Sequence, residues 1–156
     1  MISVVIATQN DEQTLGQTLA SLVPAAVDGL VREVILADAG STDETLAIAE
    51  DAGARVVRCD GPVEARLVEG CKAARADWLL VLETSTPAPQ GWEGAAGRHI
   101  ERHAGRAACW GRSGLAPFVT HAKAVLIPRR LFEAQSGKSG WLRNLGAKAT
   151  ALKIKR

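Results

Sequence analysis

The sequence has few cysteines and no long apolar segment. Its 156 residues include three cysteines, Cys59, Cys71 and Cys109, in no Cys-x-x-Cys spacing. We therefore expect no disulfide framework and no structural zinc site, but free thiols in a reducing, cytoplasmic compartment. The apolar run at residues 2–7 follows no basic segment and is too short for the core of a signal peptide or for a membrane span. The length is that of one domain.

Acidic residues are scarce towards the C-terminus. Residues 1–97 hold 6 Lys and Arg against 15 Asp and Glu, whereas residues 98–156 hold 13 against 2. A basic segment of this kind favours contact with the phosphate of a nucleotide, a nucleic acid or an anionic lipid. The alternative is that the basic half packs against the acidic one. Nucleic acid ranks lower, because no aromatic platform or recognisable binding module accompanies the basic residues.

Short apolar runs alternate with amphipathic segments along the first part of the chain. The runs predict strands and the segments predict helices. Strands are expected at residues 2–7, 34–37, 55–59 and 77–82, and helices at residues 12–23, 42–52 and 63–75. Pro24 is expected to end the first helix and Gly53 the second. This alternation implies right-handed crossovers and a mainly parallel sheet, an α/β fold.

Residues 33–45 are the stretch around which the other segments are organised. An apolar run leads into Asp38, and Gly40 then precedes a capping hydroxyl and the acids of a first helical turn. Ligands of open α/β sheets bind outside the carboxyl ends of the strands, so Asp38 is expected at the mouth of a site. Thr8 and Glu83 directly follow the strands expected at residues 2–7 and 77–82, so they are expected at the same edge. The alternative is a well-capped helix after a buried strand.

Together these segments resemble family 2 glycosyltransferases of the GT-A fold. The resemblance rests on residues 3–12, on the Asp-x-Gly-Ser-x-Asp signature at residues 38–43, on Ala65-Arg66 with Gly70, and on an apolar strand followed by an acid and later Gly91-Trp92. It covers residues 2–92, with a weaker echo at residues 124–133. It implies a GT-A-like three-layer sandwich with a mainly parallel sheet. It also implies transfer of a sugar from a nucleotide-diphosphate donor of the UDP type to an unknown acceptor, such as a lipid-linked or cell-envelope glycan.

The resemblance also divides the single domain of residues 1–156. It implies a nucleotide-binding half at residues 1–97, a shortened acceptor half at residues 98–140 and a basic tail or helix at residues 141–156. The residues implied at the nucleotide are Thr8, Asn10, Glu12, Asp38, Gly40, Ser41 and Arg66. A carboxylate can accept hydrogen bonds from a base or ribose, and a guanidinium can pair with phosphate. Gln9 departs from the family, which often has an aromatic residue there to stack on the base.

The metal motif that the family implies is incomplete in this chain. The family's Asp-x-Asp holds Mn²⁺ or Mg²⁺ on the donor diphosphate, and the aligned segment is Glu-Thr-Ser at residues 83–85. One carboxylate remains, so weakened metal binding is expected, with Glu83 and Ser85 as candidates to contact the metal or the diphosphate. Arg129 and Arg130 are candidates to take over part of the cation's charge.

No catalytic residue can be named from the sequence. Inverting members of the family need a carboxylate base, but Glu133 is the only acid after Glu101. Two hypotheses follow. One is a working glycosyltransferase of the hexosyltransferase type, and the other is a non-catalytic GT-A relative that binds a nucleotide or a partner.

Residues 141–156 combine apolar and basic side chains. A weakly amphipathic basic helix of this kind suits the anionic surface of a membrane, which predicts a protein peripheral to its inner face. The alternatives are a solvated tail and a helix packed on the domain.

Overall fold

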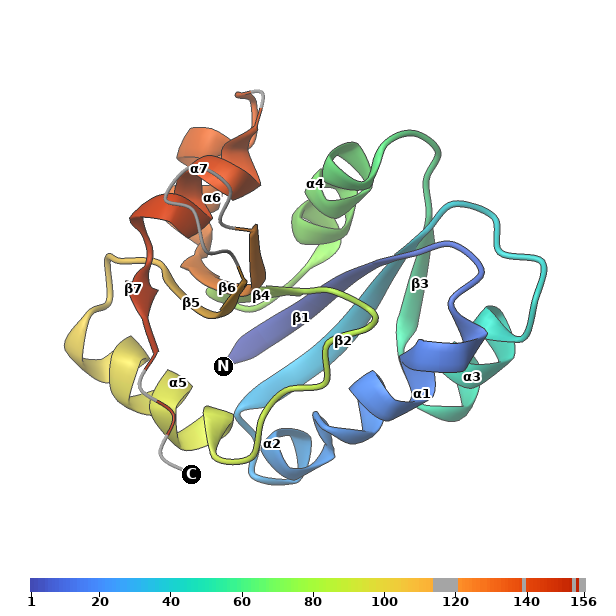
Figure 1. Ribbon diagram of the computed structural model, residues 1–156, viewed down its shortest axis with the longest axis horizontal. Coiled ribbons are helices and arrows are strands. Elements are labelled where there is room, and N and C mark those ends of the chain that lie inside the picture. The colour runs from blue at the N-terminus through green and yellow to red at the C-terminus, as the bar shows by residue number, and fades with distance from the viewer. Residues whose placement is uncertain (114–120, 139, 153, 155–156) are drawn as a thin grey trace.

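A computed structural model describes residues 1–113, 121–138, 140–152 and 154 (Figure 1). Its strands are β1 (Ile2–Thr8), β2 (Val31–Asp38), β3 (Arg55–Arg58), β4 (Trp78–Leu82), β5 (Ala108–Ser113), β6 (His121–Pro128) and β7 (Thr150–Ala151). Its helices are α1 (Glu12–Ala20), α2 (Val23–Val27), α3 (Thr45–Asp51), α4 (Val63–Ala73), α5 (Trp92–Arg102), α6 (Arg129–Gln135) and α7 (Trp141–Lys148). The expected alternation of strands and helices is confirmed.

The strands form one sheet in the order β3-β2-β1-β4-β6-β5-β7. Strands β3, β2, β1 and β4 are parallel neighbours. Strand β6 runs antiparallel to both β4 and β5, and β7 is parallel to β5. The sheet is therefore mixed but mainly parallel, as predicted. Because β6 is reversed, it begins at the edge of the sheet where β1, β2 and β4 end.

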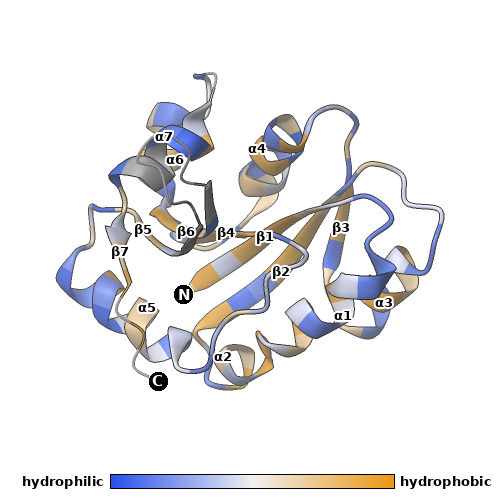
Figure 2. Cartoon of the chain, in the orientation of Figure 1, coloured by the Kyte–Doolittle hydropathy of each residue, from blue (hydrophilic) through white to orange (hydrophobic). Residues whose placement is uncertain are grey.

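Helices cover both faces of the sheet and give the predicted three layers (Figure 1). Helices α1, α2, α3 and α5 lie on one face, and α4, α6 and α7 lie on the other. Apolar residues are concentrated on the strands and on the helix sides next to them (Figure 2). Neighbouring residues of β1 pack into different hydrophobic cores, one on each face of the sheet. Ile6 packs in a cluster with Leu15 of α1, and Val5 packs in a cluster with Leu67 of α4. This follows from the alternation of side chains along a strand.

Helix α4 lies close to the sheet because residue 70 is glycine. A Cβ atom at Gly70 would stand 2.6 Å from Val5 Cγ1 and 3.3 Å from Ala37 Cβ, distances that leave no room for a methyl group. Gly53 has a φ of 66° just after α3, as expected for the residue that ends this helix. The prediction for Pro24 is wrong, because it stands in the first turn of α2, where its fixed φ and missing N–H are tolerated.

The C-terminal segment packs on the domain. Trp141 is 2% exposed, and its ring centroid is 5.3 Å from that of Phe132. Leu152 and Ile154 pack against the core that contains Ile6, and β7 extends the sheet. These three side chains are packed on the domain, as the packed alternative expected, and are not free to face a membrane. Residues 153, 155 and 156 lie outside the described part of the chain, so contact of the basic residues of this segment with a membrane stays a prediction. No helix in the described part of the chain has the length and apolar character needed to cross a bilayer.

Candidate functional site

The carboxyl ends of the parallel strands meet at one edge of the sheet. Thr8 at the end of β1 pairs with Asp38 at the end of β2. Strand β4 ends beside the start of β6, where the backbone N–H of Glu83 donates to the carbonyl oxygen of Lys123 at 3.1 Å. The prediction that Thr8, Asp38 and Glu83 share this edge is confirmed. This is the edge at which open α/β sheets bind their ligands.

Asp38 is fully buried and holds the turn that follows β2. Its carboxylate accepts hydrogen bonds from Thr8 Oγ1 at 2.9 Å, Ser41 Oγ at 2.5 Å, and the backbone N–H groups of Gly40 and Ser41 at 2.8 and 2.9 Å. Burial alone would raise the pKa of this carboxyl, but the hydrogen bonds from Ser41, Thr8 and Gly40 hold it below its ordinary value. In this structure the Asp38 side chain is 0% exposed and does not line the cavity described below. The expected direct contact with a nucleoside is thus corrected to a positioning role, in which Asp38 fixes a turn whose Gly40 has a φ of 79°.

Asn10 and Glu12 join the loop after β1 to the loop after β2. Asn10 Oδ1 accepts from the backbone N–H of Thr42 at 2.9 Å, and the backbone N–H of Asn10 donates to Ser41 Oγ at 2.9 Å. The Glu12 carboxylate accepts from the backbone N–H of Glu44 at 3.1 Å. Asn10, Glu12 and Ser41 therefore brace the border of the site, and none of them lines the cavity described next.

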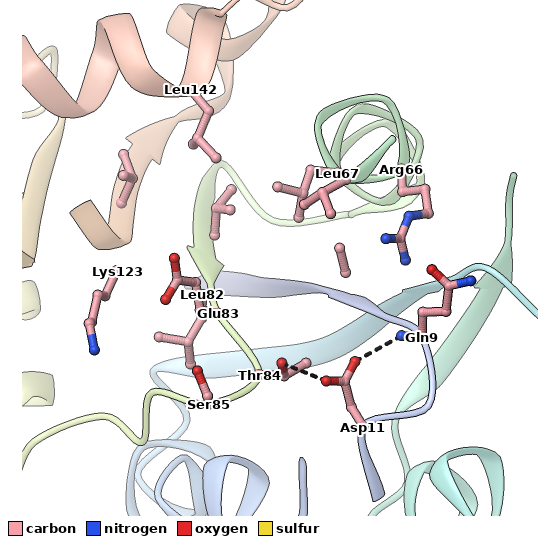
Figure 3. A pocket seen from close by; sticks show the side chains of 14 residues that line it. Gln9, Asp11, Arg66, Leu67, Leu82, Glu83, Thr84, Ser85, Lys123 and Leu142 are labelled. Carbon is pink, nitrogen blue, oxygen red and sulfur yellow. Dashed lines mark hydrogen bonds between the residues drawn. The ribbon is translucent and has the colours of Figure 1, made fainter. Parts of the chain in front are cut away.

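A cavity of about 460 Å³ opens at this edge, next to α4 and α7 (Figure 3). Its apolar wall includes Val81 of β4, Val125 of β6 and Leu142 of α7. Its polar side chains are Gln9, Asp11, Arg66, Glu83, Thr84, Ser85 and Lys123. An apolar wall with a few converging polar groups is typical of small-ligand sites, and so is a volume of this size.

Arg66 is a buried cation beside the cavity. It is 5% exposed, and its Nη1 donates to the carbonyl oxygen of Thr8 at 2.6 Å. Its Nε is buried and has no hydrogen-bond partner. Neither of the two ion pairs found among the described residues includes Arg66. A buried charge without a counter-ion is costly, so this wall of the cavity favours an anionic ligand.

The side chains of residues 83–85 point in two directions. Thr84 Oγ1 donates to Asp11 Oδ1 at 3.0 Å, while Asp11 Oδ2 accepts from the backbone N–H of Gln9 at 2.8 Å (Figure 3). Glu83 and Ser85 line the cavity on the side of Lys123 (Figure 3). Asp11 and Lys123 were not among the site residues expected from the sequence, although the positive charge of the C-terminal half indicated in general that a cation could lie at the site.

The donor set does not fit a firmly held divalent cation. Hard cations prefer roughly six to eight oxygen ligands, with carboxylates prominent among them. Here Glu83 and Asp11 supply the carboxylates, but both oxygens of Asp11 already accept hydrogen bonds, from Thr84 Oγ1 and the backbone N–H of Gln9, and Ser85 supplies only a neutral hydroxyl. Within the part of the chain that the structure describes, no three His, Cys, Asp or Glu side chains are grouped to hold a metal. Weak metal binding stays a prediction, and this donor set supports it.

Arg129 and Arg130 lie at the opposite edge of the sheet. Strand β6 ends beside the start of β4, away from the cavity. Arg129 donates to the carbonyl oxygen of Ala74 at 2.6 Å and to that of Ala76 at 2.9 and 3.0 Å. The prediction that these two arginines neutralise a diphosphate is therefore wrong, because the reversed strand carries them away from the site.

The fold and this site define a GT-A domain, and the chain belongs to glycosyl transferase family 2, whose profile matches residues 3–84. Glucosyl-3-phosphoglycerate synthase of Mycolicibacterium paratuberculosis is 52% identical over 56 residues, which are 36% of this chain and 17% of that protein. The enzyme of the same name from Mycolicibacterium smegmatis is 46% identical over 56 residues, 36% of this chain and 18% of its own length. The match to these curated relatives thus spans less than a fifth of their length.

Solved structures resemble the chain over a much longer stretch. Glucosyl-3-phosphoglycerate synthase from Mycobacterium tuberculosis in complex with Mn²⁺ and UDP-glucose has a TM-score of 0.76 and 21% identity, covering 99% of this chain and 69% of that one. The same enzyme in complex with UDP has a TM-score of 0.73 and 23% identity, covering 100% and 72%. At this identity the likeness shows the fold, which is the GT-A fold expected from the sequence.

Proposed function

We propose that this protein binds a UDP-sugar in the cavity at the carboxyl edge and transfers the hexose to an acceptor. The observation that carries the proposal is the buried Arg66, which takes part in neither ion pair found among the described residues and faces a cavity of nucleotide-compatible size at the family's donor edge. Membership of glycosyl transferase family 2 supports the reaction class. The names of similar proteins support UDP-glucose as the donor to test first.

In this proposal the residues of the edge have separate tasks. Asp38 fixes the turn after β2, so that backbone groups rather than its carboxylate meet the nucleoside. Arg66 and Lys123 face the diphosphate, whose charge grows when the bond to the sugar breaks. Fixed cations that are already in place stabilise that charge without reorganisation. Catalytic residues are not assigned.

The acceptor is proposed to be a small phosphorylated acid rather than a lipid-linked glycan. The curated relatives are named for 3-phosphoglycerate. The apolar side chains Trp141, Leu152 and Ile154, which would have served a lipid surface, are packed on the domain instead. A cytoplasmic location accords with this choice and with the free thiols of Cys59 and Cys71.

A second candidate is a non-catalytic module that binds the nucleotide sugar. The loss of a carboxylate at Ser85 favours it, because the usual means of stabilising the leaving diphosphate is weakened. Calorimetric titration with UDP-glucose, followed by measurement of UDP release in the presence of 3-phosphoglycerate, separates the two. Binding with UDP release supports transfer, and binding without release across a panel of acceptors supports the module. No binding of any nucleotide sugar contradicts both.

A further inference from the structure

We propose that the cavity binds the diphosphate of its nucleotide without a divalent cation, with the ammonium group of Lys123 and the guanidinium of Arg66 supplying the positive charge. The inference rests on the proposed function, since it concerns the same site. It departs from the Mn²⁺ complexes of the similar structures.

Lys123 lies beside Glu83 in the lining of the cavity. Its carbonyl oxygen accepts from the backbone N–H of Glu83 at 3.1 Å, so the two residues lie side by side on neighbouring strands. Val81 pairs with Val125 on those strands, and all four residues line the cavity. Side chains two positions apart along a strand point to the same face. The antiparallel register therefore directs Lys123 and Glu83 to the same face, over the cavity.

Lys123 takes part in neither ion pair found among the described residues. The ion pairs among the described residues join Arg55 to Glu33 and Lys72 to Glu69. Glu83 and Lys123 are joined by a backbone hydrogen bond between neighbouring strands, but their side chains form no ion pair. In Figure 3 the Lys123 and Arg66 side chains lie on opposite sides of Glu83. An anion bound over this loop would thus have a cation on either side.

Lys123 and Arg66 together match the charge of the metal ion that they would replace. One ammonium and one guanidinium together carry the formal charge of one divalent cation. Arg66 is held in position by its bond to Thr8 and by burial, so little side-chain entropy remains to be lost when a phosphate binds. Residues 83–85 offer a divalent cation only one carboxylate ligand. Lys123 and Arg66 are part of the chain, so their positive charge does not depend on such ligands. The carboxylates of Glu83 and Asp11 also line the cavity, so its four charged side chains sum to zero formal charge. Asp11 is engaged by Thr84 and Gln9, and the inference requires that Lys123 and Arg66, rather than Glu83, face the bound diphosphate.

The test is calorimetric titration of the full chain with UDP, in EDTA and in Mn²⁺. For the unaltered protein we expect the Kd for UDP to differ less than about threefold between the two conditions. The variant Lys123→Met should raise the Kd for UDP by about 10- to 100-fold, the value of a charge-assisted contact. Its Kd for uridine, which has no phosphate, should not change.

Two further variants serve as controls. Lys72→Met removes the same charge from an exposed site on α4 that does not line the cavity, and it should leave the Kd for UDP unchanged. Ser85→Asp restores the missing carboxylate and should create a dependence on Mn²⁺, with a gain of about 10-fold or more. A thermal melt of Lys123→Met establishes that this variant is folded.

The outcomes separate this inference from the proposed function. UDP that binds tightly only with Mn²⁺, or Lys123→Met that binds UDP as the unaltered protein does, overturns the metal-independent site and leaves nucleotide binding intact. Failure to bind UDP or UDP-glucose under either condition overturns the proposed function and this inference together.

Discussion

Replacing Asp38 with asparagine keeps the shape of the side chain and removes its charge. The remaining oxygen can still accept from the hydroxyls of Thr8 and Ser41, which lie at 2.9 and 2.5 Å. The new amide NH₂ then faces the backbone N–H groups of Gly40 and Ser41, which donate to the carboxylate at 2.8 and 2.9 Å. Donors would face donors, and the N–H of Ser41 is in a buried position. We expect Asp38→Asn to lower the free energy of unfolding at pH 7 by about 2–4 kcal/mol, from one unsatisfied buried donor and the loss of charge-assisted bonds.

Urea unfolding followed by tryptophan fluorescence measures this loss, because the indole rings of Trp78, Trp92, Trp110 and Trp141 are buried. Asp60→Asn is the matched control, since Asp60 is exposed in a loop, and its effect should stay within about 0.5 kcal/mol. A loss below about 0.5 kcal/mol in Asp38→Asn would refute the argument that Asp38 holds the turn.

The same variant tests the pKa of Asp38 through the pH dependence of stability. A carboxyl whose pKa is lower in the folded state stabilises that state above its unfolded pKa, here near 3.8, and loses this contribution as the pH falls through the folded value. The stability difference between the unaltered protein and Asp38→Asn should therefore be full at pH 7 and should narrow below the unfolded pKa. A difference that stays constant into this acid range would mean that the pKa of Asp38 is not lowered by folding.

Three other perturbations have defined outcomes. Gly70→Ala should lower the free energy of unfolding by about 1–3 kcal/mol through overlap with Val5, whereas Gly97→Ala, which meets no atom within 4 Å, should be neutral or stabilising in urea unfolding. Arg129→Met should cost about 1.5–3 kcal/mol of stability but leave the Kd for UDP unchanged in calorimetry, since this arginine bonds carbonyl groups at the far edge. Burial raises the pKa of Cys71 to about 12, so iodoacetamide at pH 8 should alkylate it only in urea, as read by mass spectrometry; alkylation of the folded protein would contradict this burial.

The first part of the fold follows from local sequence patterns. Apolar runs and amphipathic segments each have their own period, and parallel strands joined by helices must all end at one edge. This logic correctly placed Thr8, Asp38 and Glu83 together. It could not show that the carboxylate oxygens of Asp38 are occupied by neighbours, because Thr8 comes from another strand. An acid at a strand end predicts a site, but only the three-dimensional packing distinguishes a ligand contact from a brace.

The second part of the sheet depends on the direction of β6, which local pattern does not reveal. A parallel strand here would have carried Arg129 and Arg130 to the donor edge. The antiparallel strand instead begins at that edge, brings Lys123 to the cavity and delivers the two arginines to the other side. The same reversal thus accounts for both the wrong prediction and the missed cation.

The division of charge along the chain can now be interpreted through contacts. Both ion pairs among the described residues lie within residues 1–97, so no acid of this half is paired there with a cation of residues 98–156. Where the halves do meet through Glu64, its carboxylate accepts from the backbone N–H groups of Gly140 and Leu142, both at 3.3 Å, rather than from a basic side chain. Internal neutralisation through ion pairs therefore does not explain the basic C-terminal half in the part of the chain that is described. Among the side chains that the structure describes, this half brings the ammonium group of Lys123 to the donor edge, on the side of the cavity where the family's metal motif has lost a carboxylate.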